Sequence, residues 1–470
     1  METTQSTQLE QYRQALYASF DHAADATFEL LDALASQSVA RSVAELSLES
    51  VFRRGYSSLY DAITGFHKDR EGSERAQTRR QQEVAQMHLL ASYVPAPEKR
   101  PYWLFATDAT SNRRQFARTL QDRGYVYWPN SVAGNKPVTI GHSYSVLVAL
   151  PEKAVGDPPW VVPLLNRRIT TAETETEVAA AHLKSVFGDE TLPWHGQLTV
   201  QILDSKHSTS AYLHSAAQHE NHVTITRVRG NRVLYRQYQS PPGERKPGKP
   251  RSYGERFALR EPETWHVPDD QFETNYTSKR GRVYTVKIQA WHNMLMRGKR
   301  AYPMHERPFT LVQVVWYDEH GEPIHKKPLW LLVFGQRRQE LTLEQVNAAY
   351  RQRFDQEHFF RFGKQRLLLA TYQTPEAEHE ENWWQLVMRA YVMLFLARHL
   401  SEQLPRPWER YLPQPKNGLA SPAAVQRGFG RIIRAFGTPA RSPKPRKNSP
   451  GRAKGTPGKR RKRWPVVKKG

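Results

Sequence analysis

The first part of the chain has a helical pattern of apolar residues. Between positions 8 and 66 they recur mostly at three- and four-residue steps, as at Phe28, Leu31 and Leu34, while glycine and proline are scarce. This spacing places apolar side chains on one face of a helix. A polar run and three closely spaced prolines follow and mark a boundary. The pattern therefore predicts a helical domain over residues 1–95.

Short apolar runs typical of β-strands come next. They lie at residues 102–106, 144–150, 160–165 and 198–203, and a helical segment from about residue 172 to 187 lies between the last two. Because strands and a helix alternate here, the pattern predicts a mixed α/β domain over residues 96–210.

A β-rich stretch then separates this domain from two further helices. Four strand-like runs, the first VTITRV and the last FTLVQVVWY, and a basic turn-rich loop, PPGERKPGKPRSYG, occupy residues 211–325. An apolar strand at 329–334 follows, and Thr342 with Gln345 forms a capping box that marks a helix start. A second, apolar helix is predicted at 383–400.

The composition limits the chemistry. The chain has 470 residues, enough for two or three domains, and with 39% hydrophobic residues it has material for a packed core. It has no cysteine, which excludes a disulfide framework, a thiolate zinc site, an iron–sulfur cluster and a cysteine nucleophile. Any metal must therefore be held by oxygen or imidazole ligands.

Positive charge is concentrated near the C-terminal end. The formal net charge is +23, from 69 Lys and Arg against 46 Asp and Glu. Thirteen of the cations and no acid lie in residues 441–470, among five prolines, so the first 440 residues carry 23 − 13 = +10. Such a composition cannot bury a core, so residues 411–470 are predicted to be a disordered, Pro-rich arm that follows phosphates. A solubilising tail without a specific role is the alternative.

This charge favours a polyanionic partner, and nucleic acid is the commonest polyanion inside cells. The most apolar stretch, at residues 387–396, contains Arg389 and is shorter than the roughly 20 residues of a membrane span. The first residues have neither the basic start nor the apolar centre of a signal peptide. We therefore expect a soluble cytoplasmic protein with no membrane partner.

Two aspartates follow predicted strands. Asp108 comes directly after YWLFAT, and Asp204 comes directly after LTVQIL. Acids at the carboxyl ends of strands in an α/β sheet lie where such folds place their sites. Each alone is more often a turn or capping residue. The motifs of a phosphate-binding loop and of an H-E-x-x-H metal site are absent.

A third group of polar residues lies in the helix that starts with the capping box. Tyr350, Arg353, Glu357 and Lys364 fall within about 60° of one another on a helix of 100° per residue. Such a stripe suits a phosphodiester, because the acid can hold a divalent ion while the cations and the phenol grip phosphates. A solvated face with i,i+4 ion pairs is the alternative, and Gly363 offers a helix end before Lys364.

The spacing Y-x2-R-x3-E-x6-K, preceded by the two aspartates, resembles the signature of DDE transposases of bacterial insertion sequences, in the group with this Tyr-Arg-Glu-Lys motif. Asp108, Asp204 and Glu357 match its three acids in order. The resemblance covers about residues 100–400. It implies an α/β fold with a ribonuclease-H-like core at 96–210 and 326–410 and a β-rich insertion at 211–325. The predicted N-terminal helical domain is compatible with the resemblance, and the predicted disordered basic C-terminal tail lies outside it.

The resemblance also implies an activity: Mg²⁺-dependent cutting at insertion-sequence ends, followed by joining of the 3′ ends to target DNA. Asp108, Asp204 and Glu357 are implied to be the catalytic residues and to hold two Mg²⁺ ions, for which Mn²⁺ is a substitute. The implied partners are double-stranded DNA with terminal inverted repeats, target DNA and a second copy of the chain in a DNA-bound homodimer. The implied location is the bacterial nucleoid.

Further residues receive roles from the same resemblance. Tyr350, Arg353 and Lys364 are implied to bind DNA phosphates. Trp330, which leads the strand before the Glu357 helix, is implied to stack in the space left by a flipped base, and a core position is its alternative. The helical domain at 1–95 is expected to recognise the terminal repeat, with packing or dimerisation as the alternative.

Three other functions stay open on the sequence. A transposase-derived DNA-binding or architectural protein would keep the fold without catalysis. A basic protein that compacts nucleic acid would need only the charge. Another ribonuclease-H-like nuclease would act on RNA hybrids or DNA junctions.

Overall fold

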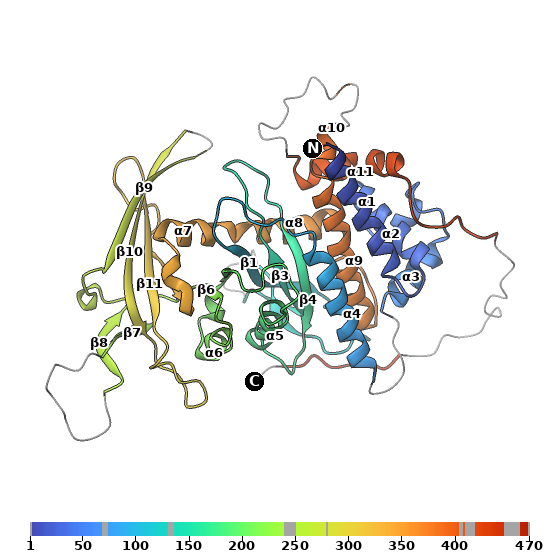
Figure 1. Cartoon of the computed structure of the whole chain (residues 1–470). Helices are drawn as coiled ribbons and strands as arrows, with labels where there is room; N and C mark the ends of the chain where they lie inside the picture. Colours follow the sequence, from blue (N-terminus) through green and yellow to red (C-terminus); the bar gives the residue numbers. More distant parts are fainter. Residues whose placement is uncertain are drawn as a thin grey trace.

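One large β-sheet runs through the molecule, and helices lie beside it (Figure 1). The computed structural model describes residues 2–67, 74–129, 136–238, 251–278, 281–403, 408, 419–445 and 461–468. Within them the sheet has twelve strands, ten in the order β2-β3-β1-β5-β6-β12-β11-β10-β7-β8, while β4 pairs with β3 and β9 with β10. No helix in these ranges is long and apolar enough to cross a lipid bilayer.

Six strands form the half of the sheet that holds the predicted α/β domain. They are β1 (Trp103–Arg113), β2 (Gly124–Tyr127), β3 (Val138–Ala149), β4 (Val162–Ile169), β5 (Thr199–Leu203) and β6 (His222–Arg227). β1, β5 and β6 are parallel neighbours, whereas β3 lies antiparallel between β1 and β4. The helices α5 (Glu175–Phe187) and α6 (Ser210–Ala216) connect β4 to β5 and β5 to β6. This mixed α/β arrangement is compatible with a ribonuclease-H-like core.

The sheet continues without a break into the region predicted as an insertion. The strands of this region are β7 (Val233–Gln237), β8 (Tyr253–Ala258), β9 (Asp270–Thr277), β10 (Val283–Leu295) and β11 (Phe309–Tyr317), and β12 (Leu329–Phe334), in the predicted second part of the core, joins β11 to β6. The VTITRV run, which the sequence pattern assigned to the insertion, is β6 and pairs in parallel with β5. A buried strand does not reveal its neighbours in its own sequence, so only the pairing places it in the core sheet. Most of the basic loop of this region, residues 239–250, lies outside the described residues.

The predicted N-terminal helices pack around a later helix, α9 (Ala377–Leu396). They are α1 (Glu2–Ala18), α2 (Ala24–Ser36), α3 (Tyr56–Gly65) and α4 (Glu74–Ala91), with a 3₁₀ turn, η1 (Ala44–Leu48). One hydrophobic core runs from Leu9 to Ala440 and includes almost every apolar side chain of α9. These helices therefore share their core with the second half of the chain, because α9 covers the apolar faces of α1, α2 and α3.

The region predicted as a disordered tail contains a packed helix, so the prediction is wrong for that part. It is α11 (Pro422–Phe436), which follows the short α10 (Leu400–Gln403) and buries Val425, Phe429 and Ile432. The strongly basic, proline-rich composition of the whole segment hid this helical spacing. Residues 446–460 lie outside the described residues. Near the C-terminus, Val467 forms a parallel bridge with Gly124 of β2.

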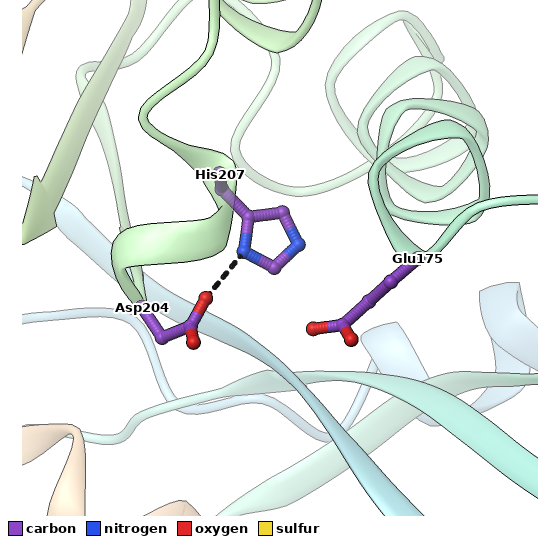
Figure 2. Close-up of side chains that lie close together, drawn as sticks. All are labelled: Glu175, Asp204 and His207. Atoms are coloured by element: carbon purple, nitrogen blue, oxygen red, sulfur yellow. Dashed lines mark hydrogen bonds and ion pairs between the residues drawn. The ribbon is translucent and has the colours of Figure 1, made fainter. Parts of the chain in front are cut away.

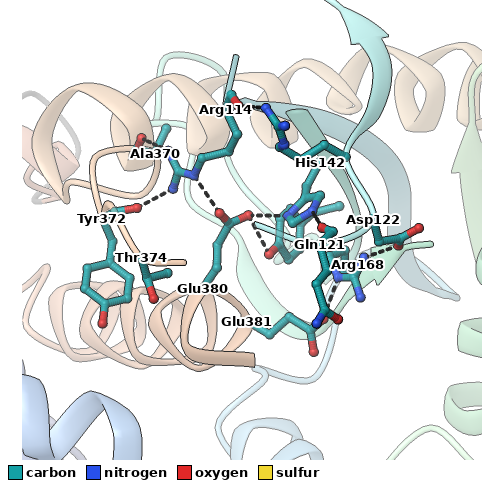
Figure 3. A network of polar contacts seen from close by, with 12 residues as sticks. Arg114, Gln121, Asp122, His142, Arg168, Ala370, Tyr372, Thr374, Glu380 and Glu381 are labelled. Carbon is teal, nitrogen blue, oxygen red and sulfur yellow. Dashed lines mark hydrogen bonds and ion pairs between the residues drawn. The ribbon is translucent and has the colours of Figure 1, made fainter. Parts of the chain in front are cut away.

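A buried network of polar side chains ties α9 to the end of β1 and to β3 (Figure 3). Glu380 is fully buried; its carboxylate accepts from Arg114 Nε at 2.6 Å and from the Tyr144 hydroxyl at 2.9 Å, and lies 3.0 Å from His142 Nδ1. Arg114 also donates to the backbone carbonyls of Ala370 and Tyr372. Burial raises the pKa of Glu380, but hydrogen bonding to His142 and the charge of Arg114 outweigh it and lower this pKa to about 2.

Candidate active site

The strand register brings the two predicted aspartates together. Thr107 and Leu203 form the last parallel pair between β1 and β5, and the next residues are Asp108 and Asp204. Asp108 does not end its strand as expected: β1 continues to Arg113, paired with β3. Since β5 ends while β1 runs on, both acids lie at the carboxyl end of β5, where the sheet opens.

Asp204 is held by a tight turn. It precedes the 3₁₀ turn η2 (Ser205–His207); its Oδ1 accepts from the Lys206 backbone N–H at 2.9 Å and lies 2.9 Å from His207 Nδ1. Burial raises the pKa of Asp204, but the hydrogen bond and charge of His207 outweigh it, so this pKa lies below its usual range. The Asp204 side chain is therefore an ionised carboxylate at neutral pH.

The pKa of Asp108 is shifted in the opposite direction, above its usual range. Burial raises its pKa to about 6, the charge of Arg353 opposes this rise, and the nearby Asp204 and Glu175 add to it. Two carboxylates this close repel each other unless a cation lies between them. Burial is thus the main cause of the raised pKa of Asp108, and the charge of Asp204 adds to it.

Arg353 joins the third predicted acid to the first. Its Nη1 lies 3.2 Å from Asp108 Oδ2, and its Nη2 lies 2.5 Å from Glu357 Oε1. The side chain of Glu357 is 39% exposed, compared with 20% for Asp108. The structure thus places Asp108, Glu357 and Arg353 in one cluster beside Asp204.

The predicted single helix is two consecutive helices, α7 (Leu343–Gln352) and α8 (Phe354–Arg366). Its expected start is confirmed, because Thr342 and Gln345 form both hydrogen bonds of the capping box. The hydrogen-bond pattern changes at Arg353, although its backbone angles stay helical at φ −52° and ψ −33°. Gly363 lies inside α8 and does not end it. The break therefore falls at the residue that contacts both acids.

Lys364 reaches back to β1, two residues beyond Asp108. Its Nζ donates to Thr110 Oγ1 at 2.7 Å and to the Ser111 carbonyl at 2.9 Å. Burial lowers the pKa of this ammonium to about 8. Thr110 and Asp108 are two residues apart on β1, so Lys364 contacts the face of the strand that carries Asp108.

Tyr350 and Trp330 are more buried than their predicted DNA contacts require. Tyr350 is 7% exposed, and burial raises its pKa. Trp330 is 3% exposed, with ring centroids 5.1 Å from Trp265, 5.6 Å from Trp291 and 6.1 Å from Phe257. In this structure Trp330 is a core residue of the second half of the sheet, and its stacking on DNA stays a prediction.

Two residues that the sequence did not single out border Asp204, as Figure 2 shows. Glu175, Asp204 and His207 each offer a ligand atom, and these atoms lie within 4.8 Å of one another. Among the described residues, the buried Glu175 Oε1 and His207 Nε2 have no hydrogen-bond partner. Glu175 opens α5 after the Thr174 cap, a usual place for an acid, so its sequence position gave no signal.

This set of side chains fits a divalent cation. Asp204 and Glu175 offer carboxylate oxygens of the kind that Mg²⁺ prefers, and His207 offers an imidazole nitrogen, whereas Asp108 and Glu357 are paired with Arg353. Among the described residues, Glu175 Oε1 and His207 Nε2 have no hydrogen-bond partner, so both atoms are free to contact a cation.

A mixed α/β sheet with acids at the carboxyl end of its parallel strands is compatible with the ribonuclease-H-like fold of metal-dependent nucleases. The chain belongs to the family described as DDE superfamily endonuclease, which matches residues 15–298. The matched part contains Asp108, Glu175 and Asp204, while Glu357 lies beyond it. Enzymes of this superfamily act on DNA and use divalent metal ions. A comparison with curated proteins finds no match.

Proposed function

We propose that this protein is the transposase of a bacterial insertion sequence, of the group with the Tyr-Arg-Glu-Lys motif. It cuts DNA at the ends of the element and joins the freed 3′ ends to target DNA. The observation that carries the proposal is the cluster formed by Asp108, Asp204 and Glu357, with Arg353 bonded to two of them.

Asp108, Asp204 and Glu357 are the proposed ligands of two Mg²⁺ ions, which when bound would activate the nucleophile and stabilise the leaving 3′ oxygen. The chain's own cations orient the DNA. Arg353 lies between two acids, where its planar guanidinium can turn to a phosphate. Lys364 is hydrogen-bonded to Thr110 and Ser111 of β1, two and three residues after Asp108. From this position its ammonium holds a phosphate next to the scissile one.

The remaining regions receive supporting roles in this proposal. The helices of residues 1–95 recognise the terminal repeat, and the basic residues after 441 add affinity without sequence preference. Two copies act on two ends. Because the N-terminal helices cover α9, these roles must be tested by surface substitutions in the full chain and not by deleting the helices.

The direct test uses the DNA that flanks the gene. A duplex carrying both flanking segments is incubated with the protein and Mg²⁺, and the positions of new 3′ ends are mapped. Cuts at the boundary of an inverted repeat, followed by joining to a second DNA, are expected. Specific binding of the repeat without cuts in Mg²⁺ or Mn²⁺ would instead indicate an inactive, DNA-binding derivative of a transposase.

A pair of conservative variants tests which glutamate is the third acid. Glu357→Gln is expected to abolish cleavage, whereas Glu175→Gln is expected to lower it by about 10- to 100-fold, the usual effect of a group that supports a metal ligand. The physical reason is that Glu357 shares Arg353 with Asp108, while Glu175 is paired with Lys206 at 2.8 Å. Cleavage rates at saturating Mg²⁺ are the measurement. If Glu175→Gln abolished cleavage while Glu357→Gln only lowered it, Glu175 would be the third acid instead of Glu357.

A further inference from the structure

A basic segment near the C-terminus, residues 461–468, is docked on an edge of the sheet. β2 is the first strand in the sheet order, and Val467 pairs with Gly124 of β2 in a parallel bridge. The Val467 N–H donates to the Arg123 carbonyl at 2.9 Å, and the Trp464 N–H donates to a carbonyl of the β1–β2 connection at 3.0 Å. The docked segment therefore pairs with backbone groups at an edge of the sheet, where a strand has no further neighbour.

Side chains hold the docked segment in the same place. The Arg123 guanidinium donates to the Trp464 carbonyl at 3.4 Å, and Arg461 is ion-paired with Glu376, the N-cap residue of α9. Lys462 Nζ lies 4.2 Å from the centre of the Trp464 ring. Arg123 is buried, so its contact ties the segment to the packed part of the chain. This segment, which its composition predicts to be disordered, is therefore attached to the folded body.

The docked segment and the β1–β2 connection expose positive charge together. The exposed cations of this surface are Arg113, Arg118, Arg461, Lys462, Arg463 and Lys468. The docked segment supplies four of them, and β1 and its connection to β2 supply the other two. Among the described acids nearby, Glu376 is paired with Arg461 and Asp122 with Arg168, so neither adds an unbalanced negative charge. Exposed cations clustered on one surface are the feature by which proteins bind nucleic-acid phosphates.

This basic surface lies beside the acid cluster. Arg113 is the last residue of β1 and follows Asp108 by five residues, and since a strand rises about 3.3 Å per residue, the two lie about 17 Å apart. The Arg113 guanidinium is 5.5 Å from the centre of the Trp128 ring, and Trp128 lines a cavity of about 840 Å³ together with Lys364. Duplex DNA rises about 3.4 Å per base pair, so a duplex held at the acid cluster reaches this surface about five base pairs from the cut.

We propose that the docked segment is a fixed part of the DNA-binding surface and that, with Arg113 and Arg118, it binds phosphates of the duplex beside the cut. The inference rests on the proposed function and adds to it that this part of the basic tail acts in one place and not as a free arm. A free arm loses conformational entropy when it binds DNA, whereas a segment already held on β2 has lost most of it on folding. Docking therefore raises the affinity for DNA without additional charge.

The first experiment tests the docking and uses the absence of cysteine from the chain. Gly124→Cys and Val467→Cys are combined in the full-length protein, because neighbouring strands lie about 4.7–4.9 Å apart, within the range of about 4.4–6.8 Å that a disulfide spans. A side chain fits at Gly124, since its Cβ would lie 3.6 Å from the Val467 carbonyl oxygen and 3.4 Å from Thr171 Cγ2. Mild oxidation is expected to give a disulfide within one chain, detected by mass spectrometry of tryptic peptides. Gly124→Cys with Val155→Cys is the control pair, since Val155 is 87% exposed in the β3–β4 connection. Absence of the intrachain disulfide would overturn the docking.

The second experiment measures what docking contributes to DNA binding. Trp464→Pro and Val467→Pro together remove both backbone donors and leave every charge in place. Binding of a duplex of random sequence is measured without metal over a range of salt concentrations. The double variant is expected to bind about tenfold more weakly at physiological salt, and the slope of log K against log salt is expected to fall by about 2 to 3, since each phosphate contact contributes about 0.9. Val466→Pro is the matched control, because the Val466 N–H is not one of the two donors.

The outcomes separate this inference from the proposed function. The cross-linked protein is expected to bind DNA as tightly as the wild type, because the segment acts where it is docked. Equal affinity of the double proline variant and the wild type would overturn the inference even where the disulfide forms. This binding assay needs no cleavage, so that result leaves the transposase proposal intact. If the wild type cuts no element end, the proposed function fails, while weaker binding by the double proline variant would still show that the docked segment binds DNA.

Discussion

Replacing Asp204 with asparagine is expected to lower the rate of metal-dependent DNA cleavage by at least about a thousandfold. Asparagine keeps the shape of the side chain but removes the negative charge that holds a divalent ion in the proposed function. The ion supplies several kcal/mol of charge stabilisation, and about 1.4 kcal/mol corresponds to a factor of ten in rate. The same loss is expected for Asp108→Asn, because the two acids follow the last parallel pair of β1 and β5.

The measurement is single-turnover cleavage of an end-containing duplex across a Mg²⁺ titration. Asp270→Asn is the matched control, since Asp270 is an exposed acid at the start of β9, away from β1 and β5. All variants should melt at the temperature of the wild type. Cleavage by Asp204→Asn within tenfold of the wild-type rate would exclude Asp204 as a metal ligand.

Replacing Glu380 with alanine is expected to lower the free energy of unfolding by about 3–5 kcal/mol, the usual cost of removing one partner of a buried ion pair. The variant leaves the Arg114 guanidinium buried without its carboxylate, and the Tyr144 hydroxyl loses its acceptor. Urea unfolding of the wild type and the variant is the measurement. The exposed Glu190 offers the matched control, Glu190→Ala, for which a change within about 0.5 kcal/mol is expected.

The same network predicts a pH dependence of stability. The pKa of Glu380 is about 2 in the folded chain, below its ordinary value of 4.5. The folded state therefore binds the proton less tightly than the unfolded state, so this stabilisation is complete above about pH 4.5 and is lost as the pH falls towards 2. Glu380→Gln should flatten this part of the stability profile. An unchanged acid transition in the variant would show that other carboxylates control it.

Local features of the fold could be predicted because they depend on neighbouring residues. The helix start at Thr342 is confirmed by its capping box, and the helical segment expected near residues 172–187 is α5. The membership of β6 in the core sheet could not be predicted, because a buried strand carries the same apolar pattern whichever strand it pairs with. α11 was missed for a different reason: its apolar spacing lies inside a segment dominated by lysine, arginine and proline.

The candidate site was predicted in part. The sequence singled out Asp108, Asp204 and Glu357, and the membership of the DDE superfamily agrees with a nuclease site built on acids. Their catalytic roles and the Tyr-Arg-Glu-Lys group stay predictions. Glu175 and His207 escaped notice, because an acid in the first turn of a helix and a histidine in a short turn are common without any function.

The sequence by itself determined where many of the helices and strands form, where the basic residues are concentrated and which side chains can carry chemistry, since these properties depend on residue type and on spacing along the chain. Only the tertiary structure decided which of those residues meet. The parallel pairing of β1 with β5 makes Asp108 and Asp204 neighbours, although they are far apart in the sequence. Arg353 joins Asp108 to Glu357, and Tyr125 and Tyr127 of β2 line the same cavity as Lys364. Long-range contacts of this kind come from the packing of the whole chain and leave no local pattern in the sequence.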